Sequence, residues 1–204
     1  MIKAIIEDMA QKKALSARLG AMPRQAPILA SNTSSFPIHE MGEAASRPTH
    51  MVGLHFFNPV QLMKLVEVVR TPATAEDALA RARAYATRVG KTPIQAADTP
   101  GFVVNRLLVP YLGEAIRMLA RGDASKEDID TGMMLGCGHP MGPITLLDYV
   151  GLDTTLFIMD GWHQRYPDNP LFEPPALLRE LVAQGHLGRK SGRGFYEWEG
   201  DKRK

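Results

Sequence analysis

Residues 51–59 read Met51-Val52-Gly53-Leu54-His55-Phe56-Phe57-Asn58-Pro59, a short apolar run that carries one histidine and ends at an Asn-Pro turn. A run of this kind, bounded by a turn signal, is typical of a strand buried on both faces of a parallel sheet. Further strand candidates are Ile28–Ser31 before it and Lys64–Val69 and Pro93–Ala97 after it. Because helical segments separate most of these strands, the sequence predicts an α/β fold with a mostly parallel sheet.

The segments between the strands have helical signals. Residues 2–20 place apolar side chains at mostly helical spacing and end at Gly20, a short helix is expected from Pro37, and alanine-rich residues 75–89 precede Gly90. A parallel nucleotide-binding domain normally opens with a strand and a glycine-rich phosphate turn, but no G-x-G-x-x-G stands ahead of a helix here. We therefore expect residues 1–97 to form a partial Rossmann-like domain that opens on a helix.

A turn-rich break, Asp98-Thr99-Pro100-Gly101, separates this part from a second pattern. Four helices are expected: one over Phe102–Arg121 (interrupted by Pro110), one from Ser125 to Leu135, a single one within Pro143–Tyr166 and one over Pro175–Gln184. The tail from Gly188 to Trp198 predicts a closing turn and strand, because glycines come first and aromatic residues follow. Residues 98–204 are therefore expected to form an all-helical domain apart from this tail.

Composition and charge narrow the class of protein. The 204 residues carry a net charge of +2, and the basic residues are scattered, which argues against a nucleic-acid partner. The single cysteine, Cys137, cannot form an internal disulfide and fits a reducing compartment. No apolar run approaches the roughly 20 residues that span a bilayer. No secretory signal is visible, since the opening stretch carries acidic residues as well as lysines. We expect a soluble intracellular protein without a membrane partner, with Cys137 structural and Met133 and Met134 in the core.

His55 is the strongest candidate for chemistry, since ligands bind at the carboxyl ends of strands in open α/β sheets. The simpler interpretation is a core histidine satisfied by a backbone carbonyl. The Asn58-Pro59 turn favours a catalytic role for His55. After such a turn, Lys64–Val69 can run back beside the strand that carries His55 and bring Glu67 close to it. A carboxylate on one imidazole nitrogen fixes the tautomer and raises the basicity of the other, as a general base requires.

Two further polar side chains are candidates with structural alternatives. Ser34 follows the first strand and is either a turn former or a hydroxyl that faces the same cleft. Asn105 lies near the start of the first long helix and is either an interdomain hydrogen-bonding residue or part of the site. Glu7 and Lys12 on the opening helix are, by charge alone, solvated surface residues. No histidine has metal-ligand spacing, so no metal site is expected.

Several runs of the sequence resemble the L-3-hydroxyacyl-CoA dehydrogenases of fatty-acid β-oxidation, most closely the short monofunctional enzymes. They are Ala30–Ser35, Gly53–Pro59, Met63–Val68, Asp98–Arg106, Arg121–Asp130, Gly142–Asp148, Asp148–Asp153 and Gly192–Tyr196. Their order and spacing are preserved over essentially the whole chain, which makes the resemblance far more specific than one short motif.

The resemblance implies roles for individual residues. It implies that His55 is the general base, that Glu67 orients it, and that Ser34 and Asn105 contact the reacting oxygen. The cofactor contacts it implies fall on Glu7, Lys12, Ser34, Asn58 and Lys190. The implied reaction is oxidation of a (3S)-3-hydroxyacyl-CoA by NAD, in which the nicotinamide does the redox chemistry and the protein supplies alignment and a base. It also implies a homodimer formed through the helical domain.

The family's phosphate-binding glycine turn, ribose-binding acidic residue and CoA-contacting insertion would all precede residue 1. We therefore expect the chain by itself to bind NAD weakly. The alternative functions are a non-catalytic dimerisation and acyl-CoA-binding fragment, or a dehydrogenase of another β-hydroxy acid, such as the lambda-crystallin-like enzymes. The expected location is the cytoplasm of a bacterium, or the mitochondrial matrix if the source is eukaryotic.

Overall fold

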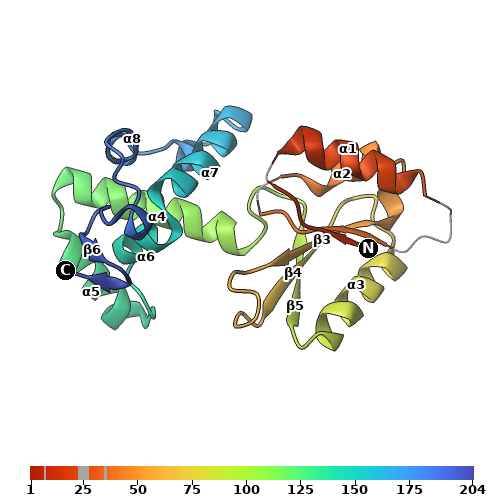
Figure 1. Cartoon of the computed structure of the whole chain (residues 1–204), viewed down its shortest axis with the longest axis horizontal. Helices are drawn as coiled ribbons and strands as arrows, with labels where there is room; N and C mark the ends of the chain where they lie inside the picture. Colours follow the sequence, from red (N-terminus) through yellow and green to blue (C-terminus); the bar gives the residue numbers. More distant parts are fainter. Residues whose placement is uncertain (7, 23–27, 35) are drawn as a thin grey trace. The chain divides into compact units, whose positions relative to one another are not determined.

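The protein divides into two compact units, Met1–Arg106 and Leu107–Lys204. The structure, a computed structural model, describes residues 1–6, 8–22, 28–34 and 36–204 (Figure 1). The first unit contains a sheet with helices on it, and the second is built mainly of helices. The expected fold class, a partial Rossmann-like sheet followed by a helical part, is confirmed.

The sheet of the first unit has five strands in the order β1-β2-β3-β4-β5. Their bounds are Ile2–Lys3 (β1), Leu29–Ser31 (β2), Met51–Phe56 (β3), Leu65–Arg70 (β4) and Thr92–Ala97 (β5). Strands β1, β2 and β3 are parallel, β4 runs antiparallel to β3, and β5 is parallel to β4. The reversal follows the turn at Asn58-Pro59, whose peptide bond is cis.

Helices cover both faces of this sheet (Figure 1). They are α1 (Met9–Gly20), α2 (Ile38–Ala44) and α3 (Glu76–Arg88), and a 3-10 turn, η1 (Pro48–His50), precedes β3. Alternate strand residues point to opposite faces, so the sheet forms two separate cores. One core joins Leu29, Met51 and Val69 to Ile38 and Met41 of α2. The other joins Ala30, Val52 and Val68 to Leu79 and Ala82 of α3.

A glycine in β3 lets α2 lie close to the sheet. Gly53 is the register partner of Val69 in β4. A Cβ at Gly53 would stand 2.7 Å from Val69 Cβ and 3.1 Å from Ile38 Cδ1. Contacts that short require the neighbouring atoms to move, so the absent side chain of Gly53 sets how closely α2 packs.

The expectation that the chain opens on a helix was wrong at its first residues. Ile2 and Lys3 pair in parallel with Ala30 and Ser31, and the helix begins only at Met9. Asp8 is its N-cap, since the carboxylate accepts a hydrogen bond of 2.8 Å from the Gln11 amide. A two-residue strand is too short to show an alternating pattern, and its isoleucine fitted the helical spacing by coincidence.

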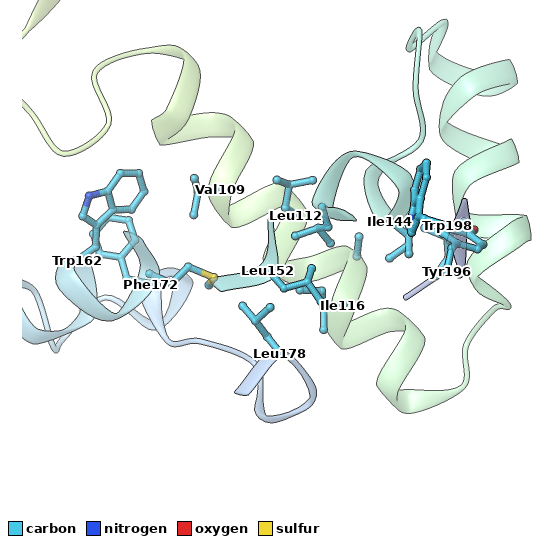
Figure 2. Close-up of a cluster of buried hydrophobic side chains, with 14 residues drawn as sticks. Val109, Leu112, Ile116, Ile144, Leu152, Trp162, Phe172, Leu178, Tyr196 and Trp198 are labelled. Carbon is cyan, nitrogen blue, oxygen red and sulfur yellow. The ribbon is translucent and has the colours of Figure 1, made fainter. Parts of the chain in front are cut away.

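The second unit packs its helices around one hydrophobic core. The helices are α4 (Val104–Arg121, which begins in the first unit), α5 (Lys126–Cys137), α6 (Pro143–Val150), α7 (Leu152–Arg165) and α8 (Ala176–Ala183). Short 3-10 turns, η2 (Pro170–Phe172) and η3 (Arg189–Ser191), and a hairpin of β6 (Trp198–Glu199) with β7 (Lys202–Arg203) complete it. Figure 2 shows the core, in which side chains of α4, α6, α7 and α8 meet aromatic residues of the tail.

Two buried carboxylates hold the ends of this core together. Asp130 of α5 accepts hydrogen bonds from the amides of Ile144 and Thr145 at the start of α6. Asp148 of α6 accepts from the Tyr196 amide at 2.9 Å and from Trp198 Nε1 at 2.8 Å. The aromatic tail is therefore fastened to α6 by a side chain that the sequence did not single out.

Some expectations for the second unit were wrong. The segment Pro143–Tyr166 contains two helices, which are separated at Gly151, where φ is +99°. Met134 is 41% exposed, so it lies outside the core, contrary to expectation. Cys137 is exposed, and its structural role stays a prediction. Within the described residues, no helix combines the length and the apolar composition that a membrane span needs.

Candidate active site

His55 and Glu67 face each other across the antiparallel pair β3 and β4. They are register partners, so both side chains leave the sheet on the same face. His55 Nδ1 lies 2.6 Å from Glu67 Oε2, a hydrogen-bonding distance. His55 is 3% exposed and Glu67 is fully buried. The antiparallel turn thus places a carboxylate directly behind the imidazole.

The second oxygen of Glu67 is held by the backbone. Oε1 accepts hydrogen bonds from the amides of Val103 at 3.0 Å and Val104 at 2.9 Å, where α4 begins. These amides are turned toward Glu67 by Gly101 and Phe102, whose φ angles are +75° and +55°. A positive φ is unfavourable for a side chain as large as phenylalanine, so the surrounding structure must hold this turn in place.

Ser34 lies at the opposite nitrogen of the imidazole. Its Oγ is 3.1 Å from His55 Nε2. The loop that carries Ser34 is attached to the end of β3, because Asn32 Oδ1 accepts a hydrogen bond of 3.0 Å from the Phe56 amide. Because Glu67 accepts a hydrogen bond from the N–H group at Nδ1, Nε2 of a neutral His55 is left as the acceptor that faces the hydroxyl.

Aromatic rings lie against the imidazole. The centroid of the Phe57 ring is 4.5 Å from that of His55, and the centroid of the buried Phe102 ring is 5.6 Å away. These rings limit the access of water to His55, and exclusion of water strengthens the electrostatic interaction of His55 with Glu67.

Two asparagines proposed from the sequence lie in the same unit as His55. Asn58 is exposed and stands two residues beyond the end of β3, at the carboxyl edge of the sheet. Asn105 is half-buried in the first turn of α4, directly after the amides that hold Glu67. Among the described residues, its side-chain amide has no hydrogen-bond partner, and its role in the site stays a prediction.

The three charged residues proposed as cofactor contacts have different surroundings. Lys12 was expected, by charge alone, to be solvated, but it is 1% exposed and its Nζ donates to the Ile5 carbonyl at 3.1 Å. Lys190 belongs to the second unit, where its Nζ lies 2.6 Å from a carboxylate oxygen of Asp153. Glu7 lies outside the described residues.

The sequence assigned no role to Asp98 or His39, whose side chains meet at the start of α2. Asp98 accepts hydrogen bonds of 2.8 Å from the amides of Ile38 and His39, and Oδ2 lies 2.6 Å from His39 Nδ1. In the sequence, Asp98 is the first residue of a turn and of the family-like run Asp98–Arg106, and no role was assigned to it. Because β5 runs antiparallel to β3, Asp98 follows the edge of the sheet opposite to the carboxyl end of β3, so its position gave no signal of a site.

The arrangement provides a base with an adjacent donor. His55 Nε2 can take a proton from a hydroxyl group, and Glu67 stabilises the imidazolium that results. Ser34 Oγ can hydrogen-bond the oxygen that loses the proton. No group of three or more His, Cys, Asp or Glu side chains is placed to hold a metal ion within residues 1–6, 8–22, 28–34 and 36–204.

Comparison with known proteins identifies the family. Residues 1–99 match the model of the NAD binding domain of 3-hydroxyacyl-CoA dehydrogenase, and residues 101–198 match the model of its C-terminal domain. The mitochondrial hydroxyacyl-coenzyme A dehydrogenase of Mus musculus is 53% identical over 199 residues, which cover 98% of this chain and 63% of the mouse protein. A probable 3-hydroxybutyryl-CoA dehydrogenase of Deinococcus radiodurans is 47% identical over 198 residues, covering 97% of this chain and 71% of that protein.

Solved structures give the same result. The crystal structure of (S)-3-hydroxybutyryl-CoA dehydrogenase PaaH1 from Ralstonia eutropha has a TM-score of 0.92 at 42% identity, and the match covers 97% of this chain and 70% of that one. FadB2 of M. tuberculosis has a TM-score of 0.90 at 47% identity, with 97% of this chain and 70% of that one covered. The chain spans less than two thirds of the length of the mouse protein. Both family models and these similarities show that the chain belongs to the 3-hydroxyacyl-CoA dehydrogenase family.

Proposed function

We propose that this site oxidises a (3S)-3-hydroxyacyl-CoA to the 3-oxoacyl-CoA, with NAD as the oxidant and His55 as the general base. The observation that carries the proposal is the continuous set of contacts from Ser34 Oγ to His55 Nε2 and from His55 Nδ1 to Glu67 Oε2. A base oriented by a buried carboxylate, with a hydroxyl donor beside it, suits removal of a proton from a secondary alcohol.

Each side chain has a separate task in the proposed reaction. His55 Nε2 accepts the proton of the substrate's 3-hydroxyl group, and Glu67 holds the ring and stabilises its charge. Ser34 and Asn105 hydrogen-bond the same oxygen and fix its distance from Nε2. In the reverse direction the protonated imidazole returns the proton to the 3-oxo oxygen. Such positioned proton transfer contributes about 10²–10⁴-fold to a rate.

NAD fits the residues at the carboxyl edge of the sheet. His55 and the Ser34 loop come at the ends of β3 and β2, the edge where dinucleotides bind in this type of sheet. When bound there, NAD supplies the group that accepts the hydride from the substrate's C3. We assign Ser34, Asn58 and Lys12 of the first unit to its binding, together with Glu7, and the role of Lys190 stays a prediction.

A homodimer formed through the second unit is the assembly we propose. Large apolar side chains of this unit are left exposed in the single chain, among them Leu107 (71%), Leu135 (82%) and Phe157 (58%). Exposed apolar side chains of this size favour burial against another surface. Acyl-CoA is the proposed small-molecule partner, and the cytoplasm or the mitochondrial matrix is the proposed location, according to the source.

The test is a steady-state assay of NADH formation from (3S)-3-hydroxybutyryl-CoA, alongside calorimetric titration with NAD and with the acyl-CoA. NADH formation that is lost in His55→Gln supports the proposal. Binding of the acyl-CoA without turnover at saturating NAD would instead assign the chain to the non-catalytic alternative. Turnover of a β-hydroxy acid without a CoA group would assign it to another dehydrogenase class.

A further inference from the structure

The carboxylate of Asp98 joins two segments that are far apart in the sequence. It lies directly after β5, and its side chain is 3% exposed. Its two oxygens accept hydrogen bonds from the Ile38 and His39 amides, 60 and 59 residues away, at the beginning of α2. The N-cap residue of α2, Pro37, provides no side-chain cap of its own. Asp98 therefore supplies the acceptors that the first turn of α2 needs.

Each of the two joined segments holds one side of the imidazole of His55. The segment before α2 carries Ser34, four residues ahead of Ile38, and Ser34 contacts Nε2. The segment after Asp98 carries the amides of Val103 and Val104, which hold Glu67 against Nδ1. Asp98 thus contacts the start of α2, which follows Ser34 in the chain, and it also begins the turn whose amides hold Glu67.

We propose that Asp98 is a positioning residue, which fixes the Ser34 loop and the 99–104 turn relative to each other and thereby holds His55 in one orientation and one tautomer. The proposal rests on the proposed function only where it takes His55 to be the catalytic base. Asp98 contacts Ile38 and His39 and does not contact His55. It therefore acts on His55 through Ser34 on one side and Glu67 on the other.

The chemistry of Asp98 suits this task. A carboxylate accepts on both oxygens, and here it accepts from two backbone amides and from the His39 ring. Hydrogen bonds to charged acceptors are shorter and stronger than hydrogen bonds to neutral ones. Two of these three partners are backbone amides, so their bonds to Asp98 fix the position of the chain. The turn it fixes includes Phe102 with its positive φ, a conformation that requires such support.

The experiment observes His55 directly and needs neither NAD nor substrate. Long-range ¹H–¹⁵N correlation spectra of the ¹⁵N-histidine-labelled full chain report which ring nitrogen carries the proton, and the spectrum of His55→Gln identifies the His55 signals. In the unmodified chain we expect one tautomer, with the proton on Nδ1. In Asp98→Ala we expect His55 signals that are averaged between the tautomers or split.

The matched control is Thr74→Val, which removes a buried hydrogen-bonding hydroxyl of the same unit. Thr74 Oγ1 donates to the Met51 carbonyl at 2.8 Å, at the far end of β3 from His55. Thermal unfolding is measured for both variants, so that a general loss of stability can be separated from an effect on His55. The His55 signals are expected to stay unchanged in Thr74→Val.

Unchanged His55 signals in Asp98→Ala, or an equal change in Thr74→Val, would overturn the proposal. If Asp98→Ala does not fold, Asp98→Asn is the deciding variant, because its amide keeps one acceptor oxygen and its NH₂ group cannot accept the second amide. There we expect altered His55 signals, and unaltered ones would overturn the proposal.

The second readout is kinetic. If the unmodified chain is active, the kcat of the Asp98 variants should fall by roughly 10- to 100-fold while their affinity for NAD stays within about twofold. Altered signals in a chain without turnover would keep this inference and remove the proposed function.

Discussion

His55 and Glu67 are directly opposite each other in the one antiparallel pairing of the five-stranded sheet, with Nδ1 2.6 Å from Oε2. Two neighbouring parallel strands must be joined by a long crossover connection, usually a helix, so residues close in the sequence do not become neighbours in such a pair. The reversal after Asn58-Pro59 brings together two residues only twelve positions apart. The polar pair is thereby built from two strands whose other residues are mostly buried and apolar.

Replacing Glu67 with glutamine should lower activity far more than stability. The glutamine oxygen can still accept the two backbone hydrogen bonds that Oε1 accepts now. Its NH₂ group then points at Nδ1 of His55, and because both groups would be donors, the tautomer with the proton on Nδ1 is disfavoured. We expect kcat to fall by about 10²–10⁴-fold, the range for loss of an oriented base. Steady-state kinetics and thermal unfolding of the same preparation check both parts. A kcat within about threefold of the unmodified chain would contradict the assigned role.

Gly53→Ala should destabilise the first unit. The new Cβ would stand 2.7 Å from Val69 Cβ and 3.1 Å from Ile38 Cδ1, so the strand or α2 has to move. Overpacking of this kind costs about 1–3 kcal/mol. Urea unfolding should show a lower free energy of unfolding, with Gly132→Ala as the control, because a Cβ at Gly132 meets no atom within 4 Å. Equal stability of the two variants would show that the close approach is relieved without cost.

Lys3→Met should stabilise the protein near neutral pH, and the gain should shrink at higher pH. Burial, with a smaller effect of Lys12, lowers the pKa of Lys3 to about 8 from 10.5. Below pH 8 the ammonium is charged in both states, and the folded state bears its full desolvation cost. Between about 8 and 10.5 the folded state loses the proton first, so the stability of the unmodified chain rises.

The lysine prediction is checked by thermal unfolding of both chains across that pH range. The difference in stability should be on the order of 3 kcal/mol at most near pH 7 and should decrease as the pH rises. Lys13→Met is the matched control, since the Lys13 side chain is 43% exposed and pairs with Glu40. A difference for Lys3→Met that stays constant with pH would show that its charge is not what the substitution relieves.

Leu135→Asp should dissociate the proposed homodimer without unfolding the chain. Leu135 is 82% exposed on α5, so a charge there costs little in the monomer. If the same side chain is buried between two copies, an unpaired carboxylate costs several kcal/mol. Analytical ultracentrifugation gives the assembly state, and circular dichroism confirms that the fold is kept. Val89→Asp is the control, since Val89 is 43% exposed and belongs to the first unit. An unmodified chain that is monomeric at micromolar concentration would contradict the assembly.

The strands β2 to β5 and the closeness of His55 and Glu67 were predictable because they depend on local signals. Each of these strands is an apolar run bounded by turn residues, and the Asn-Pro turn directs the second of the pair back along the first. The roles of Ser34, Asn58, Asn105 and Lys190 stay predictions, because they concern bound molecules and not the fold.

Other features depend on contacts that a single sequence does not reveal. The strand β1 is only two residues long and is defined by pairing with β2. The burial of Lys12 results from packing of α1 on the sheet, whereas charge alone suggested a solvated side chain. The bonds from Asp98 to α2 cross about 60 residues, so no spacing rule could indicate them.

The dependence of α2 on Asp98 has a consequence for the order of folding. A seven-residue helix is too short to persist alone in water, and this one lacks a cap from its own N-terminal neighbour. The amides of its first turn find their acceptor in the protein only after β5 has joined the sheet and brought Asp98 into place. Because such a contact closes a long loop, it forms late and raises the contact order of the unit. We expect hydrogen exchange at Ile38 and His39 to require opening of β5, so that a partly folded chain has no intact proton-transfer site.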